Sequence, residues 1–215
     1  MGKLHRLGNA LDVILQAHRV PTFIETGTFH GESLGHALTL GFSRWHSVEL
    51  SPELHRRAVE RFARHPGLTL HHGDSAAVLP EILAGLDTPG MFWLDAHWCF
   101  LNTARGPKDC PLLEELAAIA DHEQRTGLEH IVLADDVHVF GTGPDSPCVV
   151  TDDVVFVPEA DWRSITLECV RDTLGRGKQF HVWGDVLFAL PTWLDVSRVE
   201  PPHDPYTAST RSACI

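Results

Sequence analysis

Two short acidic segments contain the side chains best suited to chemistry. Asp95 and His97 belong to the run LDAHW, and Asp135, Asp136 and His138 belong to the run ADDVH. Each run follows a short apolar stretch that is typical of a buried strand. Three carboxylates at neighbouring strand ends would repel one another in a crevice of low dielectric constant unless a cation or a proton lay between them. A hard divalent ion such as Mg²⁺ suits carboxylate oxygens and keeps coordination positions for water or substrate.

The residues around these aspartates leave alternatives open. His97 adds an imidazole to the carboxylates, and a carboxylate–histidine set also suits Mn²⁺, Fe²⁺ or Zn²⁺. His138 is either a general base or a solvated loop histidine. Asp135 or Asp136 could instead cap a helix or pair with Arg105. The two segments therefore predict a metal site, with a purely structural acidic cluster as the alternative.

Three earlier segments have the residue types of a nucleoside site. The run ETGTFHG, residues 25–31, combines glycines that permit close backbone approach with the N-terminus of a following helix, which offers unpaired N–H groups. Glu49 ends the next apolar run and could accept two hydrogen bonds from a ribose diol, or be a solvated acid beside Ser51. Asp74, in the run HGDS, could face an adenine amino group or cap a helix. Each signal is weak alone.

The elements that must position these residues follow from the apolar pattern. Continuous apolar runs predict strands that are covered on both faces. Helical segments separate the runs, and this alternation predicts an α/β fold with a doubly wound, mostly parallel sheet. Near the end of the chain, two apolar runs flank the turn Gly184-Asp185, which predicts an antiparallel hairpin. The seven expected strands are Thr22–Glu25, Trp45–Glu49, Leu68–His71, Met91–Asp95, His130–Asp135, Gln179–Trp183 and Val186–Leu190.

Helix boundaries are marked by caps and breakers. Ser51 followed by Pro52 is an N-cap with proline in the first turn. Pro80 lies near the start of the next helix, so we expect that helix to be short. The stretch from Asp95 to Pro111 is longer than an ordinary strand–helix connection and is a candidate active-site loop. We expect further helices over Ser33–Leu40, from Pro111 onward and over Trp162–Leu174.

Composition limits the classes of protein. The chain has 215 residues and a formal charge of −12, which fits one domain and disfavours a nucleic-acid partner. No apolar run is long enough for a transmembrane helix, and the first residues lack the features of a secretory signal. The five cysteines are scattered, with no C-x-x-C, so we expect reduced thiols and a cytoplasmic location. We expect one domain over residues 1–200 and a flexible tail over 201–215.

The order of these motifs resembles the class I S-adenosylmethionine (SAM)-dependent methyltransferases, over roughly Pro21 to Leu190. The resemblance implies their Rossmann-like fold and SAM as cofactor. It implies that Gly27 and Gly31 line the methionine portion, that Glu49 holds the ribose and that Asp74 lies near the adenine. The expected cofactor-binding set is Glu25, Thr26, Gly27, Thr28, Gly31, Glu49, Asp74, Ser75 and Asp95.

The two acidic segments are similar to those of metal-dependent, macrolide-sugar type O-methyltransferases, which implies Mg²⁺ bound by Asp95, Asp135 and Asp136. We therefore expect methyl transfer to an oxygen of a small molecule, with Asp95, His97 or His138 as catalytic residues. The alternatives are a metal-dependent hydrolase or lyase and a non-catalytic adenosyl-binding module. A homodimer is the default expectation for its assembly.

Overall fold

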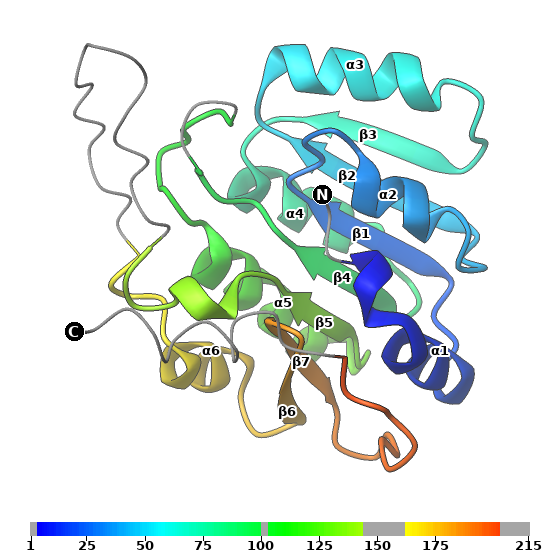
Figure 1. The fold of residues 1–215 in the computed structure, drawn as a ribbon, viewed down its shortest axis with the longest axis vertical. Coiled ribbons are helices and arrows are strands. Elements are labelled where there is room, and N and C mark those ends of the chain that lie inside the picture. Colours follow the sequence, from blue (N-terminus) through cyan, green and yellow to red (C-terminus); the bar gives the residue numbers. More distant parts are fainter. Residues whose placement is uncertain (1–3, 100–102, 144–161, 203–215) are drawn as a thin grey trace, which may run out of the picture.

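The computed structural model describes residues 4–99, 103–143 and 162–202, and it contains a seven-stranded sheet with the order β3-β2-β1-β4-β5-β7-β6 (Figure 1). The first five strands are parallel, and β7 pairs antiparallel with both β5 and β6. The predicted doubly wound sheet with a terminal hairpin is confirmed. The strands are β1 (Thr22–Thr26), β2 (Arg44–Glu49), β3 (Leu68–His72), β4 (Gly90–Leu94), β5 (Ile131–Ala134), β6 (Lys178–Trp183) and β7 (Val186–Pro191).

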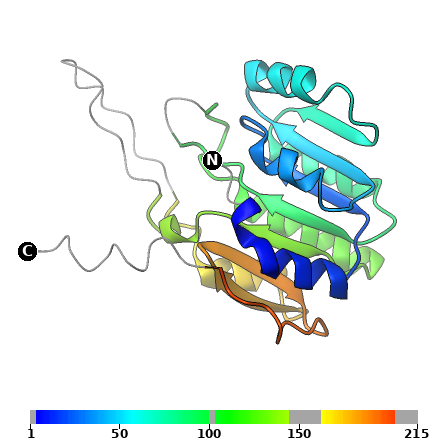
Figure 2. The ribbon, with the colours of Figure 1, turned by 45° about the vertical axis from the view of Figure 1, so that its right-hand side comes forward.

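Helices cover both faces of this sheet (Figure 2). One apolar layer joins α4 (Ser75–Ala84), α5 (Leu112–Thr126) and α6 (Leu167–Leu174) to strand residues such as Phe92. The opposite layer joins α1 (Gly8–Ala17), α2 (Glu32–Ala37) and α3 (Pro52–Phe62) to residues such as Trp93. Successive strand residues point to opposite faces, and because both faces are covered, β1, β4, β5 and β7 are buried along their whole length.

The strands and helices begin and end within a few residues of the predicted bounds, with three exceptions. Helix α1, with the short 3₁₀ turn Leu4–Leu7 before it, was not predicted, although Leu11 and Ile14 are fully packed in the core. Helix α4 was predicted to be short because of Pro80, but it has ten residues and continues past that proline. Helix α6 begins only at Leu167, where the Thr166 hydroxyl accepts a hydrogen bond from the Cys169 N–H.

The local signals around β2, β3 and the hairpin are confirmed. The Ser51 hydroxyl accepts a hydrogen bond from the Leu54 N–H, and Pro52 is the first residue of α3. Asp74 caps α4 through the Ala76 N–H at 3.2 Å. Gly184 and Asp185 form the β6–β7 turn with positive φ angles of 58° and 71°, as a tight hairpin turn requires.

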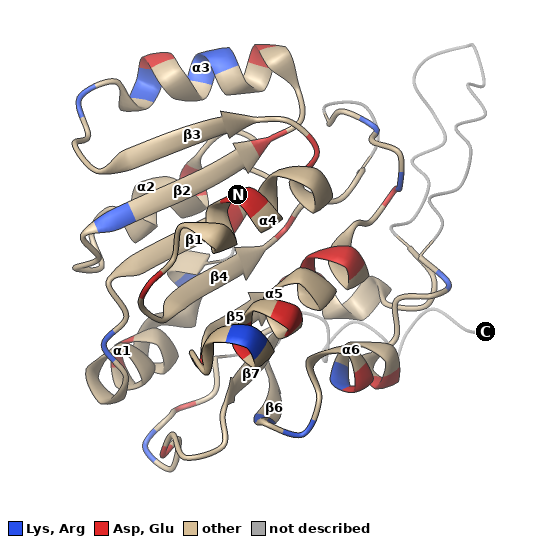
Figure 3. Cartoon of the chain, turned by 180° about the vertical axis from the view of Figure 1, so that it is seen from behind, with Lys and Arg blue, Asp and Glu red and all other residues tan. Residues whose placement is uncertain are grey.

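Charged side chains on the surface pair locally. Acidic and basic residues are interspersed along α3 (Figure 3), where Arg56 pairs with Glu53 and Glu60, and Arg57 pairs with Glu53. In the described part of the chain, no helix has the length and apolar character needed to cross a bilayer. Cys99, Cys110 and Cys169 are free thiols, whereas Cys148, Cys214 and the expected tail beyond residue 202 lie outside the described residues.

Candidate active site

A cavity of about 250 Å³ opens at the carboxyl ends of the parallel strands. In an open α/β sheet this edge is where ligands bind, because the strand order reverses there and the crossover loops diverge. Segments after all five parallel strands contribute to the cavity. Its lining residues are Gly27, Phe29, Val48, Glu49, Leu50, Leu54, Gly73, Asp74, Ser75, Asp95, Ala96, His97, Trp98, Cys99, Thr103, Ala104, Gly106, Lys108, Asp109, Pro111, Asp135 and Asp136.

In the turn after β1, neighbouring protein atoms leave no room for a side chain at two glycine positions. Gly27 has a φ of +82°, and a Cβ there would lie 2.4 Å from the carbonyl oxygen of Asp95. Gly31 has a φ of +73°, and a Cβ there would lie 2.5 Å from the Phe62 ring. Gly27 lines the cavity, whereas Gly31 does not and instead lets α2 pack on α3. The turn is therefore shaped by strand β4 and helix α3 even before a ligand is considered.

Beneath this turn, three of the predicted cofactor residues are buried and do not line the cavity. Glu25 is 1% exposed and accepts a hydrogen bond of 2.5 Å from the Ser47 hydroxyl. The Thr28 hydroxyl lies 2.6 Å from that of Ser47, and Thr26 is fully buried. Burial raises the pKa of Glu25 to about 8, against the opposing effect of the Ser47 hydrogen bond, so this carboxyl is protonated at neutral pH.

Glu49 and Asp74 line the cavity in fixed orientations. The two carboxylate oxygens of Glu49 accept hydrogen bonds from the Phe29 N–H at 2.7 Å and the Ser51 N–H at 2.8 Å. These backbone donors come from the β1 turn and the start of α3, so the fold itself aims the carboxylate. Each carboxylate oxygen keeps a second lone pair that can accept a hydrogen bond from a ligand. Asp74 has the helix-capping role given above and lines the cavity as well.

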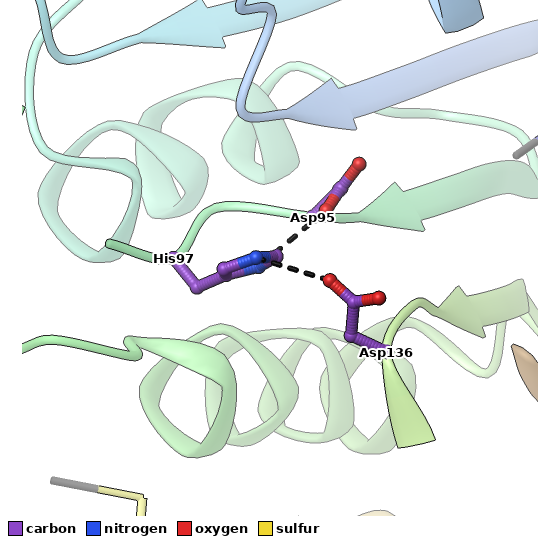
Figure 4. Close-up of side chains that lie close together, drawn as sticks. All are labelled: Asp95, His97 and Asp136. Atoms are coloured by element: carbon purple, nitrogen blue, oxygen red, sulfur yellow. Dashed lines mark ion pairs between the residues drawn. The ribbon is translucent and has the colours of Figure 1, made fainter. Parts of the chain in front are cut away.

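On the other side of the cavity, His97 lies between two aspartates (Figure 4). Its Nδ1 is 3.4 Å from Asp95 Oδ1, and its Nε2 is 3.1 Å from Asp136 Oδ2. One ligand atom from each of these three residues can be chosen such that all lie within 4.8 Å of one another. The ring of Trp162 packs edge-on against the imidazole at 4.9 Å between centroids, which restricts its rotation.

Asp135 does not belong to that group of three. It is 6% exposed, and its Oδ1 accepts a hydrogen bond of 2.8 Å from the backbone N–H of Asp136. The φ of Asp136 is +59°, a left-handed conformation that a non-glycine residue seldom adopts. Asp135 thus orients the backbone from which Asp136 projects. Asp95, Asp136 and His97 thus form the group within coordination reach, while Asp135, the third aspartate of the predicted metal set, lines the same cavity outside that group.

The electrostatics of this cluster follow from burial and proximity. Burial, together with the charge of Asp135, raises the pKa of Asp95 well above its usual value. Burial opposes the charge on His97, but hydrogen bonds to Asp136 and Cys99 and the charge of Asp95 outweigh it and raise the histidine pKa. The imidazolium therefore supplies the positive charge that the neighbouring carboxylates require.

Two arrangements in the structure were missed by the sequence analysis. His138 does not line the cavity, and its Nδ1 lies 2.8 Å from Asp185 Oδ2, while its backbone N–H donates to Asp185 Oδ1. Asp185 is 3% exposed, and only its turn-forming role was predicted. Arg105 pairs with Asp109 through distances of 2.6 and 3.0 Å, whereas Asp135 and Asp136 had been considered as its partners. No spacing rule indicates either contact, because both depend on loop conformation.

Comparisons with known proteins identify the fold. No family model matches the sequence, and no curated protein sequence matches it either. Among solved structures, the O-methyltransferase TomG from Streptomyces achromogenes, in complex with SAM, is 17% identical with a TM-score of 0.53, over 89% of this chain and 81% of that one. An O-methyltransferase from Bacillus cereus, in complex with SAH, is 15% identical with a TM-score of 0.53, over 88% and 82%.

A third solved structure, cofactor-bound Rv0187 from MTB, is 16% identical with a TM-score of 0.53, over 89% of this chain and 81% of that one. The sheet order and the position of the cavity define an open α/β fold with a crevice at the carboxyl ends of its parallel strands. More particularly, the chain has the fold of the class I SAM-dependent methyltransferases, as the motif order implied.

Proposed function

We propose that this protein is a SAM-dependent methyltransferase that methylates an oxygen atom of a small molecule with the help of a divalent metal ion. The observation that carries the proposal is the convergence of two side-chain sets on one cavity. Glu49 and Asp74 enter it from the ends of β2 and β3, and Asp95, His97 and Asp136 enter it from the ends of β4 and β5.

The charge of the cavity fits a cationic cofactor. Six carboxylates line it, with Lys108 as the one lysine or arginine among the lining residues. The sulfonium group of SAM is positive, so it is favoured in such a field, whereas the polyphosphate of a nucleotide is not. The two oxygens of Glu49 are held by backbone donors and can still accept hydrogen bonds from a ribose diol.

The donor set at the other end fits a divalent ion. Asp95, Asp136 and His97 offer two carboxylate oxygens and one imidazole nitrogen within coordination reach of one another, and Asp135 orients the Asp136 backbone. A bound metal would lower the pKa of an acceptor hydroxyl and so make its oxygen a better nucleophile. Mn²⁺ and Fe²⁺ suit this mixed set better than Mg²⁺, which prefers oxygen ligands alone.

In the proposed reaction, the acceptor oxygen attacks the methyl carbon of SAM as the bond from that carbon to sulfur breaks. The products are the methyl ether or ester, S-adenosylhomocysteine (SAH) and one proton. Asp95 borders both halves of the cavity, so its carboxylate is placed to accept the proton. Trp98 and the cavity wall exclude water and align the reacting atoms, which is the main catalytic contribution in such displacements. The names of the similar structures, two O-methyltransferases bound to SAM or SAH, support this proposal.

Thermal-shift and calorimetric titrations test the proposal. SAM, SAH, ATP, Mg²⁺ and Mn²⁺ are added separately and in pairs to the purified protein, since a specific ligand raises the unfolding temperature by mass action. We expect binding of SAM and SAH, none of ATP, and a further stabilisation with Mn²⁺. Stabilisation by metal ions but not by SAM or SAH would favour a hydrolase or lyase. SAH binding without any metal effect would favour a metal-free enzyme or a non-catalytic module.

A further inference from the structure

The loop after β4 crosses back over the cofactor side of the cavity. Within it, residues 103–109 (the loop wall) contribute Thr103, Ala104, Gly106, Lys108 and Asp109 to the cavity lining. A Cβ on Gly106 would lie 3.2 Å from Cδ2 of Leu50, the residue that follows Glu49 at the end of β2. The loop wall therefore starts from strand β4 but reaches the end of strand β2.

Three residues hold the loop wall in this position through side-chain and backbone contacts. The guanidinium of Arg105 forms two hydrogen bonds with the carboxylate of Asp109, at 2.6 and 3.0 Å. Its Cζ also lies 4.2 Å from the ring centroid of Trp98, in a cation–π contact. The backbone N–H of Trp98 donates to the backbone carbonyl of Asp109 at 2.7 Å. Trp98, Arg105 and Asp109 (the Arg105 clamp) close the loop on itself.

The Arg105 clamp differs from an ordinary surface ion pair because two of its three residues are buried. The side chain of Asp109 is only 7% exposed, and Trp98 is 9% exposed. A bidentate Arg–carboxylate pair with a stacked guanidinium fixes both distance and plane, which a lysine could not do. Lys108 pairs with Glu114 of α5, and this ties the same loop to the helix that follows it.

We propose that the Arg105 clamp positions the loop wall as one side of the compartment for the adenosyl group, so that affinity for the cofactor depends on this loop as well as on β1–β3. The inference rests on the proposed function. It assigns a cofactor-binding role to part of the stretch from Asp95 to Pro111, which the sequence indicated as a candidate active-site loop. Arg105 and Asp109 are positioning residues, because they act through the loop wall.

Two variants disturb the wall by independent routes. Arg105→Ala removes the ion pair and the stacking contact, and Gly106→Val adds bulk at the contact with Leu50. The φ of Gly106 is not in the left-handed region, so valine brings no backbone strain of that kind. For both variants we expect the Kd for SAH to rise about tenfold, with faster dissociation and a nearly unchanged association rate.

The chain offers a matched control. Arg125 and Asp121 form another Arg–Asp pair four residues apart, on the exposed face of α5, with Nε and Oδ2 2.9 Å apart. Arg125→Ala should leave the Kd for SAH unchanged. The Mn²⁺ affinity of all three variants should match the wild type, because the Asp95–His97–Asp136 group is not altered.

Calorimetry of SAH binding separates the possible results. Wild-type binding decides the proposed function, and the ratio of variant to wild-type Kd decides the role of the loop wall. A raised Kd at a stoichiometry near one in both wall variants supports the proposal. A wild-type Kd in both variants overturns it, whether or not the stoichiometry falls, since a lower stoichiometry reports only a smaller folded fraction.

Discussion

The two ends of the cavity are built on different electrostatic principles. At the β1–β3 end, the fold itself satisfies the carboxyl groups: Glu49 accepts two backbone N–H bonds, Asp74 caps α4, and Glu25 is buried beneath the floor and protonated. At the β4–β5 end, Asp95 and Asp136 face each other across His97. At the first end, backbone donors satisfy the carboxylates, whereas at the second the positive charge of His97 balances them, and a bound metal ion would take over that role.

The largest expected effect concerns the cation-dependent end. Asp136→Asn removes one of the two carboxylates of the three-residue group, so we expect the affinity for Mn²⁺ to fall about a thousandfold. The Kd for SAH should stay within about twofold of wild type, because the carboxylates at the other end keep their backbone partners. Manganese titrations followed by electron paramagnetic resonance, with calorimetry of SAH, measure both. A parallel loss of SAH binding would show that the two ends are not independent.

The next prediction decides which third residue completes the group. His97→Ala should weaken Mn²⁺ binding about a hundredfold, whereas Asp135→Asn should weaken it about tenfold, because asparagine keeps the oxygen that accepts the Asp136 N–H. The same manganese titration compares the two variants side by side. A larger loss of Mn²⁺ affinity in Asp135→Asn than in His97→Ala would favour the set of three aspartates that the sequence motifs implied.

A smaller effect is expected at the preorganised end. Glu49→Ala removes the acceptor for the ribose hydroxyls and should raise the Kd for SAH about thirtyfold. This substitution also leaves the N–H groups of Phe29 and Ser51 without their acceptor, which could destabilise the fold. The unfolding temperature of the ligand-free variant, compared with that of the wild type, is therefore the control. Glu53→Ala, on the exposed face of α3, is the matched acidic control and should not change the Kd. Unchanged SAH binding in Glu49→Ala would remove Glu49 from the cofactor site.

The last of these predictions is a pH dependence of stability from Glu25. Its pKa is near 8 in the folded protein and near 4.5 in the unfolded chain, so the folded state binds the additional proton between these values. The contribution of Glu25 to stability is therefore complete below about pH 4.5 and is lost as the pH rises to 8, at up to about 1.4 kcal/mol per pH unit. Glu25→Gln should flatten the slope between pH 6.5 and 8 in denaturant titrations. An unchanged slope would contradict the raised pKa.

The sequence predicted the topology well because the relevant signals are local. Apolar runs located the strands, Ser51 and Asp74 marked helix starts, and the Gly184–Asp185 turn marked the hairpin. The amphipathic helix α1 was overlooked, although Leu11 and Ile14 recur at helical spacing on its buried face.

The candidate site was predicted only in part, since contacts between loops have no sequence period. The runs LDAHW and ADDVH placed the acidic residues at neighbouring strand ends. They did not indicate whether His97 or Asp135 lies within coordination reach of Asp95 and Asp136. The pairing of Arg105 with Asp109 and of His138 with Asp185 depends on backbone paths that follow from tertiary packing. Gly27 and Gly31 were singled out for the methionine portion of SAM, and the structure adds that atoms of Asp95 and Phe62 leave no room for a Cβ at either position.

The most direct test of the central claim, that one cavity holds the cofactor and a metal side by side, is a crystal structure of the protein soaked with SAH and Mn²⁺. We expect the adenosine ribose against Glu49 and an anomalous manganese peak within about 2.3 Å of oxygens of Asp95 and Asp136. Manganese elsewhere, or SAH bound without contact to Glu49, would contradict it.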